Sequence, residues 1–405
     1  MLRKIAKRNI SIRIEEFKDI LSLMSNYSVN EGHFIDKFED FFKKYINSKE
    51  AIAVSSGRFA LGLILKNLGI KKGDKIITSA YNFWGIPQFL LKEGISPVFI
   101  DADCENCQID IKKTEERIDK NTKAIIVTHL FGQLCDLDSI LSIARKYNLF
   151  VIEDAAHSLG SYYHGKHTGT IGDAGFFSLT GSKMLNTSFG GIIVTDNKEL
   201  AKRIREELLT YSFPNTFTLI KERFITYIYA LVTNRTFYSI IGWPIALLMS
   251  LFNLDLLEIY KKKRKSEIAE GKMRFTNLQA LIGLNQMPLL NSLIENRKRI
   301  ARVLINNLDP CISIQKSPVN CDPNYFMIAI RARNKMKVFK RLLLKGIDTN
   351  LSYVTDCSSL VANCNNPVSR FLSDSILTIH LPFDLKTKEI LYIAKILNEI
   401  RDRLY

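Results

Sequence analysis

A single lysine stands in a short polar segment between two apolar runs of this chain. The stretch FFSLTGSKMLNTSFGG, residues 176–191, surrounds Lys183 with small and turn-forming residues, and Asp154 ends the earlier apolar run LFVIED. A lysine amine can form a Schiff base with an aldehyde, and a carboxylate can hold a proton on a ring nitrogen. Each residue alone has an ordinary explanation, a solvated lysine for the first and a helix cap for the second. Together they favour covalent chemistry on a bound cofactor.

Two further segments extend this pattern. Ser55-Ser56-Gly57 stands between a predicted strand and a predicted helix, where backbone N–H groups and the helix dipole favour a phosphate. Phe83 follows the next predicted strand and is able to lie flat on an aromatic ring. A lysine for an aldehyde, an aspartate for a ring nitrogen and a cradle for a phosphate are what pyridoxal 5'-phosphate requires. The sequence therefore predicts this cofactor.

The elements that must position these residues alternate between strands and helices. Helical spacing marks residues 12–46, and amphipathic segments then separate short apolar runs at 51–56, 74–80, 96–103, 124–132 and 149–156. This alternation predicts an α/β fold with a mostly parallel central sheet covered by helices. Ligands of such sheets bind at the carboxyl ends of the strands, which is where the candidate residues stand.

We expect three parts along the chain. Residues 1–210 would form a large cofactor-binding domain with N-terminal helices, and residues 211–265 an apolar insert with a basic flank. Residues 266–405 would form a linking helix and a smaller α+β domain.

The insert does not fit the alternating pattern. No charged residue occurs from Phe237 to Leu254, and the basic run KKKRK follows at 261–265. The apolar length approaches that of a membrane-spanning helix, but Gly242-Trp243-Pro244 interrupts it. We interpret residues 224–257 as a hairpin that dips into an anionic membrane surface, with the basic run on the headgroups. Packing in the protein interior or at a dimer interface is the alternative.

Charge and cysteine content limit the other classes of function. The formal net charge is +16, yet no motif for nucleic-acid binding accompanies it, so we expect no nucleic-acid partner. Cys104 and Cys107 form a lone C-x-x-C without further ligands, which predicts no metal site. Seven scattered cysteines and an N-terminus without a secretory pattern favour the cytoplasm, with a peripheral position on the inner face of the membrane as an option.

The chain resembles the DegT/StrS-type sugar aminotransferases, which are fold type I pyridoxal-phosphate enzymes. The resemblance spans nearly the whole chain and includes GDKIITSAYNFWGIPQFLLKEGISPVFIDAD, THLFGQLCDLDSI and LQALIGLNQM. It also includes KGIDTNLSY and the long run VIEDAAHSLGSYYHGKHTGTIGDAGFFSLTGSKMLNTSFGGIIVT. The most specific feature is Glu-Asp-Ala-Ala-His followed by Phe-Ser and a lysine five residues after that serine.

The resemblance implies roles for residues around the cofactor ring. Lys183 would bind the cofactor covalently and move a proton between the substrate Cα and the cofactor C4′. Asp154 would pair with the pyridine nitrogen, and His157, where many relatives have Gln, would lie near the ring and its hydroxyl. Phe83 would stack on the ring.

The resemblance also implies a phosphate site and a partner subunit. Ser178 would bind the phosphate together with Gly57 and Arg58, although relatives usually have Thr in place of Arg58. Lys272 and Arg274 stand where relatives place an Asn and an Arg that reach into the partner's site. A homodimer with shared active sites follows from this, and Lys272 in place of Asn would add a cation near the phosphate.

The activity that the resemblance implies is transamination. An amino donor such as glutamate would supply the amine, and a nucleotide-linked keto-sugar would accept it for surface polysaccharide or glycan synthesis. A branch of the family with His in place of the lysine catalyses dehydration, so Lys183 favours amino transfer. The alternatives are a membrane-associated member with dehydratase or lipid-linked-sugar activity, and a regulatory homologue without activity.

Overall fold

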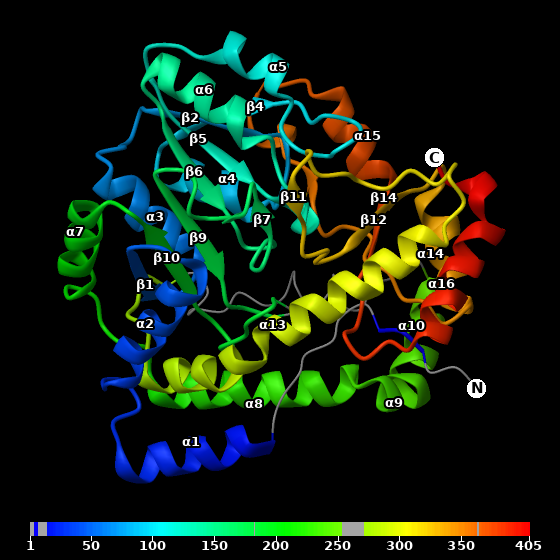
Figure 1. The fold of residues 1–405 in the computed structure, drawn as a ribbon, viewed down its shortest axis with the longest axis horizontal. Helices are drawn as coiled ribbons and strands as arrows, with labels where there is room; N and C mark the ends of the chain where they lie inside the picture. Colours follow the sequence, from blue (N-terminus) through cyan, green and yellow to red (C-terminus); the bar gives the residue numbers. More distant parts are fainter. Residues whose placement is uncertain (1–3, 7–13, 182, 253–270, 363) are drawn as a thin grey trace.

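The computed structural model describes residues 4–6, 14–181, 183–252, 271–362 and 364–405 (Figure 1). A seven-stranded sheet forms its centre in the spatial order β1-β10-β9-β6-β5-β2-β4. The strands in that order are Glu50–Val54, Gly191–Thr195, Ala174–Ser178, Phe150–Asp154, Thr122–Thr128, Lys75–Ser79 and Ser96–Ile100. The pairs from β9 to β4 are parallel, and β10 and β1 join antiparallel at one edge. The predicted α/β fold with a mostly parallel sheet is confirmed.

Helices cover both faces of this sheet, so its strands are apolar on both sides. Neighbouring residues such as Ile125 and Ile126 enter different apolar clusters because successive side chains of a strand point to opposite faces. One face packs against α3 (Gly57–Asn67), α4 (Gly85–Lys92) and α7 (Lys198–Leu208). The other packs against α2 (Phe34–Ile46), α6 (Leu137–Tyr147) and α13 (Asn277–Asn306).

Local capping explains where several of these helices begin. The Ser56 hydroxyl accepts a hydrogen bond from the Phe59 N–H, so α3 starts at Gly57, directly after β1. Asp136 caps α6 in the same way, and Thr276 forms a capping box with Gln279 at the start of α13. The predicted helices within 12–46 are confirmed as α1 (Ile14–Asn26) and α2.

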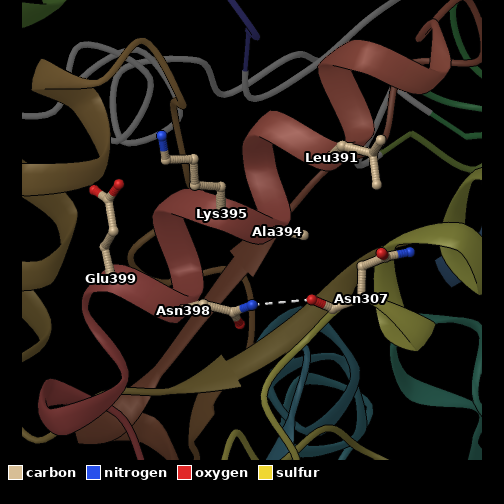
Figure 2. A pocket seen from close by; sticks show the side chains of 6 residues that line it. All are labelled: Asn307, Leu391, Ala394, Lys395, Asn398 and Glu399. Atoms are coloured by element: carbon tan, nitrogen blue, oxygen red, sulfur yellow. Dashed lines mark hydrogen bonds between the residues drawn. The ribbon is translucent and has the colours of Figure 1, made fainter.

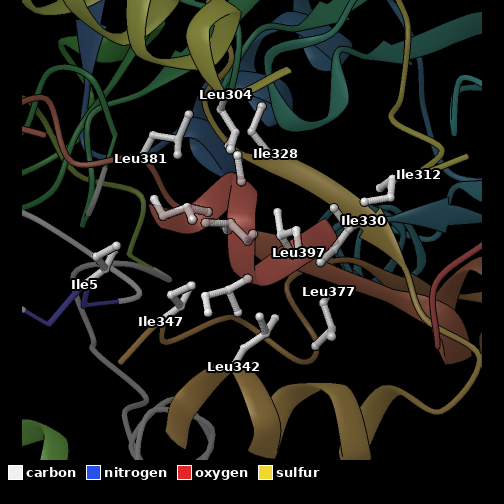
Figure 3. Packing of buried hydrophobic residues seen from close by; sticks show 14 of the residues in the cluster. Ile5, Leu304, Ile312, Ile328, Ile330, Leu342, Ile347, Leu377, Leu381 and Leu397 are labelled. Carbon is white, nitrogen blue, oxygen red and sulfur yellow. The ribbon is translucent and has the colours of Figure 1, made fainter. Parts of the chain in front are cut away.

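The C-terminal part is a smaller α+β unit with its own core (Figure 3). Strands β12 (Ile328–Arg331) and β14 (Ile376–Ile379) pair antiparallel. The helices around them are α14 (Lys335–Leu344), α15 (Pro367–Ser375) and α16 (Thr387–Glu399). Helix α13 packs on α2 at one end and on α16 at the other, so it links the two parts (Figure 1). Ile5 lies in this C-terminal core and bridges to Ile347, although the expected domain division places it in the large domain.

Short segments complete the structure. Two-residue strands pair β3 with β13, β7 with β8 and β7 with β11. They are Tyr81–Asn82, Thr355–Asp356, Tyr162–Tyr163, Lys166–His167 and Cys321–Asp322. The β3–β13 pair joins the two parts of the chain directly, because Thr355 lies opposite Asn82. Short helices lie at Ile111–Thr114 (α5), Glu115–Arg117 (η1), Leu130–Gly132 (η2), Ser358–Leu360 (η4) and Arg401–Arg403 (η5).

The described part of the insert is mostly helical from Thr216 onward. It contains α8 (Thr216–Thr233), α9 (Arg235–Phe237), the π-helical turn η3 (Tyr238–Gly242) and α10 (Trp243–Leu251). The predicted interruption at Gly242-Trp243-Pro244 is wrong, because the helical path breaks at Asn234, whose ψ is 131°. Pro244 is the second residue of α10, directly after the π-helical turn, and the backbone of Gly242 stays helical there (φ −66°, ψ −41°). The basic run 261–265 lies outside the described residues.

The length and apolar character of the helices bear on the membrane interpretation. In the part of the chain that the structure describes, none of the helices is both long enough and apolar enough to cross a membrane.

Candidate active site

The candidate residues gather where β6, β9 and the start of α3 lie side by side. Asp154 ends β6 and stands opposite Phe176 of the neighbouring β9, and Ser178 ends β9. Gly191 at the start of β10 stands opposite Ser178. The parallel strands β6 and β9 therefore bring Asp154 and Ser178 to the carboxyl ends of the sheet strands.

Asp154 is a buried carboxylate whose negative charge is stabilised by few neighbouring groups. It is 3% exposed, and its Oδ1 accepts one hydrogen bond, from the Ala156 N–H at 3.1 Å. Burial raises the pKa of Asp154 to about 6, and the positive charge of Lys183 offsets only part of that effect. A buried carboxylate of this kind is suited to a cationic N–H partner, because such a partner would restore the lost solvation.

Lys183 lies in the loop after β9 and points toward the C-terminal part. Its Nζ donates to the Tyr353 hydroxyl at 3.3 Å and lies 5.1 Å from the centre of the Phe326 ring. His157 contacts the same two rings, Phe326 and Tyr353, so Lys183 lies beside His157. The structure thus brings the two residues that opened the sequence argument into one site.

His157 is held as a neutral ring. Its Nδ1 accepts the Phe131 N–H at 3.3 Å, and its ring stacks on Phe326 with centroids 4.8 Å apart. Burial lowers the pKa of His157 well below its usual value, and the charge of Lys183 lowers it further. Since Nδ1 is an acceptor, Nε2 carries the proton and is available as a donor.

In the proposed phosphate cradle the start of α3 lies close to the end of β9 and to the start of β10. A Cβ placed on Gly57 would lie 3.5 Å from the Ser178 Cβ, so the first residue of α3 is next to the end of β9. A Cβ on Gly191 would lie 2.6 Å from the Ser56 carbonyl carbon, which leaves room there for glycine only. The Ser178 hydroxyl is 2.9 Å from the Thr180 hydroxyl. Hydroxyls and a helix N-terminus that converge in this way suit an anion.

Two other predicted residues stand less close to this group. Arg58 is the second residue of α3 and is partly buried. Phe83 follows β3 and is 45% exposed, and its ring packs against Gly85. Stacking of Phe83 on a cofactor ring stays a prediction.

Lys272 and Arg274 are engaged elsewhere in the single chain. Lys272 Nζ lies 3.3 Å from a Glu93 carboxylate oxygen, and Arg274 Nη1 lies 3.4 Å from one of Glu31. The Arg274 guanidinium also lies over the Phe213 ring at 4.2 Å. No described contact links either residue to Lys183, so their assigned role depends on a partner subunit.

Sequence reasoning assigned no role to several residues of the site. Glu153 is fully buried; burial alone would raise its pKa, but hydrogen bonds from His129 and from the N–H groups of Gly172 and Gly169 hold it below the usual value. His129 Nδ1 accepts from the Cys135 N–H. This network fixes the end of β6 beside Asp154. Glu153 precedes the candidate in the same motif, and Tyr353 ends the motif KGIDTNLSY, whereas no sequence pattern marked Phe326.

A separate pocket lies on the C-terminal unit (Figure 2). It is lined by Asn307, Leu391, Ala394, Lys395, Asn398 and Glu399, and Asn398 Nδ2 donates to the Asn307 carbonyl at 2.9 Å. None of these residues belongs to the candidate set, so this pocket is not the proposed site.

The residues present fit pyridoxal 5'-phosphate. Among the described residues no cationic donor pairs with the buried Asp154 carboxylate, Ser178 and the start of α3 converge as an anion cradle, and the Lys183 amine lies beside Tyr353 and Phe326 in the loop after β9. These three features match the ring nitrogen, the phosphate and the aldehyde of the cofactor. The fold and the site together define a fold type I pyridoxal-phosphate protein.

Comparison with known sequences identifies the family. The model of the DegT/DnrJ/EryC1/StrS aminotransferase family matches residues 11–231 and 244–398, and the chain belongs to this family. GDP-perosamine synthase of Escherichia coli O157:H7 is 30% identical over 311 residues, which are 77% of this chain and 73% of that protein. The spore coat polysaccharide biosynthesis protein SpsC of Bacillus subtilis is 39% identical over 191 residues. That match, like several others, spans about half the length of both chains.

Solved structures confirm the fold. The sugar aminotransferase CalS13 from Micromonospora echinospora superposes with a TM-score of 0.78 at 18% identity, over 98% of this chain and 99% of that one. DesV from S. venezuelae gives a TM-score of 0.76 at 22% identity, over 96% of this chain and 95% of that one. The predicted family and fold are therefore both confirmed.

Proposed function

We propose that this protein is a pyridoxal-phosphate-dependent aminotransferase that moves an amino group from a donor such as glutamate to a nucleotide-linked keto-sugar. The observation that carries the proposal is that Lys183 and His157 share Phe326 and Tyr353 as neighbours, near the buried Asp154 that ends β6, inside a fold of this family. The names of the relatives, GDP-perosamine synthase and SpsC, support a sugar acceptor and a pathway that builds polysaccharide.

When bound, the cofactor supplies an electron sink for the carbanion that forms at the substrate carbon. Asp154 would keep the proton on the ring nitrogen, because a cationic partner favours the charged form of this buried carboxylate. Lys183 would take the proton from the substrate Cα and return it at C4′, first for the donor and then, in the reverse sense, for the acceptor. His157 would donate from Nε2 toward the ring hydroxyl, and Tyr353 would orient the Lys183 amine.

The presence of lysine at position 183 favours amino transfer over dehydration. A lysine can both hold the cofactor and shuttle the proton, and both halves of a transamination need that shuttle. Dehydration of the same class of sugar is the second candidate, which product analysis would separate from the first.

The test is the visible absorption spectrum of the purified protein, with Lys183→Ala as the matched variant. We expect a cofactor band in the wild-type protein that glutamate bleaches, with one 2-oxoglutarate formed per site. We expect Lys183→Ala to lack the band of covalently bound cofactor and to form no 2-oxoglutarate. A wild-type protein that takes up no cofactor would refute the proposed function.

We also propose a homodimer whose sites are shared. In the single chain Lys272 pairs with Glu93, and Arg274 pairs with Glu31. Both pairs are partly exposed, so either cation could turn toward a partner at small cost.

Mixing two inactive variants tests the shared site. Lys183→Ala and Arg274→Ala should each be inactive alone, whereas an equal mixture should regain about a quarter of the wild-type activity per chain. Half of the dimers in that mixture are hybrids, and one of the two sites in each hybrid keeps both residues. A mixture that exchanges subunits but stays inactive would contradict a shared site. Two Lys183→Ala preparations mixed together serve as the control.

A third proposal concerns the insert, which we infer to rest on an anionic membrane surface. Its inner side packs on the C-terminal unit: Arg235 pairs with Glu389, the Tyr238 hydroxyl donates to Asp348, and Trp243 Nε1 donates to the Leu343 carbonyl at 2.7 Å. Its outer side exposes large apolar residues, each at least 44% accessible: Phe217, Phe224, Ile228, Leu231, Val232, Phe237, Ile240, Ile241, Ile245, Leu248, Leu251 and Phe252. We call this set the apolar insert face.

Spacing and charge support lipid as the occupant of the apolar insert face. Phe224, Ile228 and Leu231 follow helical spacing along one side of α8. Within residues 216–252 the only acidic residue is Glu222, which is buried, and the basic run 261–265 follows in the sequence. A face without exposed carboxylates and with nearby basic sequence suits anionic headgroups. The family model leaves residues 232–243 unmatched, so part of this face lies outside the match to the family.

Vesicle co-sedimentation tests this surface. Wild-type protein should bind phosphatidylcholine vesicles that contain phosphatidylglycerol, and salt should weaken the binding. The combined variant Phe224→Ser, Ile228→Ser, Leu248→Ser and Leu251→Ser should lose at least tenfold in binding, whereas Val319→Ser, at an equally exposed apolar site elsewhere, should not. If the variant changes the oligomeric mass but not vesicle binding, a second copy covers this face instead. Point substitutions are preferable to deletion, since deletion would also remove the buried contacts of Arg235 and Trp243.

A further inference from the structure

Four cationic side chains are buried in the described part of the chain, and one of them lacks an acidic partner. Arg223 pairs with Glu16, Arg235 with Glu389, and Lys298 with Asp322. Arg297 is equally buried, at 4% exposure, but no described carboxylate pairs with it. Burial alone lowers the pKa of Arg297 to about 10. Since an uncompensated buried charge is costly, its retention calls for an anion from outside the chain.

Arg297 stands beside the proposed reaction centre. It projects from α13, and its Nη1 contacts the thioether of Met184, the residue that follows Lys183. Its Nε has no hydrogen-bond partner among the described residues. The Arg297 guanidinium lies 5.8 Å from the centre of the Phe326 ring, and Lys183 Nζ lies 5.1 Å from the same centre. One aromatic ring therefore has the reactive lysine and the unpaired guanidinium as neighbours.

We infer that Arg297 binds an anionic group of a substrate, either a carboxylate of the amino donor or the diphosphate of the acceptor. The inference rests on the proposed function, because it takes Lys183 as the point where both substrates react. A guanidinium offers a planar fork of N–H donors that matches carboxylate and phosphate oxygens. The thioether of Met184 is a weak acceptor, so an incoming anion would replace it readily.

This assignment explains why the chain keeps a buried charge at this position. A methionine would fill similar space without desolvation cost, and replacement of buried charges by apolar residues is often neutral or stabilising. Arg297 is thus expected to cost stability in the free protein and to recover it when substrate binds, as is common for binding residues.

The experiment measures binding of two unreactive probes to the cofactor-loaded protein by calorimetry. Glutarate represents the donor carboxylates, and inorganic pyrophosphate represents the diphosphate. The variants are Arg297→Met and Arg297→Lys, and Arg299→Met, at an exposed arginine of the same helix, is the control. Cofactor content and melting temperature are recorded for each protein.

We expect Arg297→Met to weaken one probe by about 10- to 100-fold, to keep its cofactor and to melt no lower than the wild type. Arg297→Lys should retain part of the binding because it keeps the charge but not the fork.

Loss for glutarate alone assigns the donor carboxylate, and loss for pyrophosphate alone assigns the acceptor diphosphate. Equal binding by wild type and both variants would overturn the inference, and so would a wild type that binds neither probe. Loss of cofactor in both variants would also overturn it, because Arg297 would then serve the cofactor. The proposed function fails separately, when wild-type protein loaded with cofactor does not convert glutamate.

Discussion

Replacing Asp154 by asparagine should stabilise the cofactor-free protein at neutral pH and leave it little changed in acid. The carboxyl has a pKa of about 6 in the folded protein against an ordinary value of 3.8. The folded state therefore holds the proton more tightly than the unfolded state, and stability falls as the pH rises from the lower value to the higher one. Below both values the carboxyl is neutral in both states and carries no such cost.

The size of the effect follows from the difference between the two pKa values. Each pKa unit corresponds to about 1.4 kcal/mol, so the ionised carboxylate costs the folded state about 3 kcal/mol above pH 7. At pH 4.5 the same linkage gives a cost of about 1 kcal/mol. The advantage of Asp154→Asn over the wild type should therefore grow by about 2 kcal/mol between pH 4.5 and pH 7.5.

Urea unfolding of cofactor-free protein at the two pH values provides the assay, with Asp374→Asn, at an exposed aspartate, as the control. Added pyridoxal phosphate should reverse the order at pH 7.5, because only the carboxylate can pair with a protonated ring nitrogen. A stability difference that does not change with pH would refute the account of Asp154 as an uncompensated buried carboxylate. A cofactor affinity equal in both proteins would refute its pairing with the ring.

Three other substitutions test the surroundings of the site. Tyr353→Phe removes the hydroxyl that accepts a hydrogen bond from Lys183. It should slow glutamate conversion about fivefold, equivalent to about 1 kcal/mol, without changing the cofactor content. An unchanged rate would exclude an orienting role for Tyr353. The Glu153 carboxylate is buried and accepts hydrogen bonds from three backbone N–H groups and from His129. Glu153→Gln should therefore lower the free energy of unfolding, measured by urea titration, by about 3 kcal/mol. A loss below about 1 kcal/mol would show that this network contributes little to stability. Gly191→Ala places a Cβ 2.6 Å from the Ser56 carbonyl carbon, so the start of α3 must move. The substitution should lower the free energy of unfolding by about 2 kcal/mol and weaken cofactor binding in a titration. Unaltered cofactor affinity would show that this contact does not support the phosphate cradle.

The pattern of the chain sufficed for most of the large domain. Alternating apolar runs and amphipathic segments predicted β2, β4, β5 and β6 and the helices between them, because strands covered on both faces must be apolar throughout. The Ser56 cap, which starts α3, could also be read locally, since capping depends on neighbours in sequence. The break of the insert was misplaced, because the π-helical turn before Pro244, through which the path stays helical, cannot be read from the sequence.

The sequence by itself determined which functional groups are available: a lysine, an aspartate at a strand end, and small residues before a helix. Residue type decides what a side chain can do, and the spacing of Asp154, Ser178 and Lys183 is short enough to be carried by two adjacent strands. Only the tertiary structure decided what surrounds them. Phe326 and Tyr353 reach Lys183 because the C-terminal unit folds back against the sheet, and the contrast between Arg297 and its three paired counterparts depends on burial. Burial and long-range contacts set the cost of a charge, and neither can be read from neighbours along the chain.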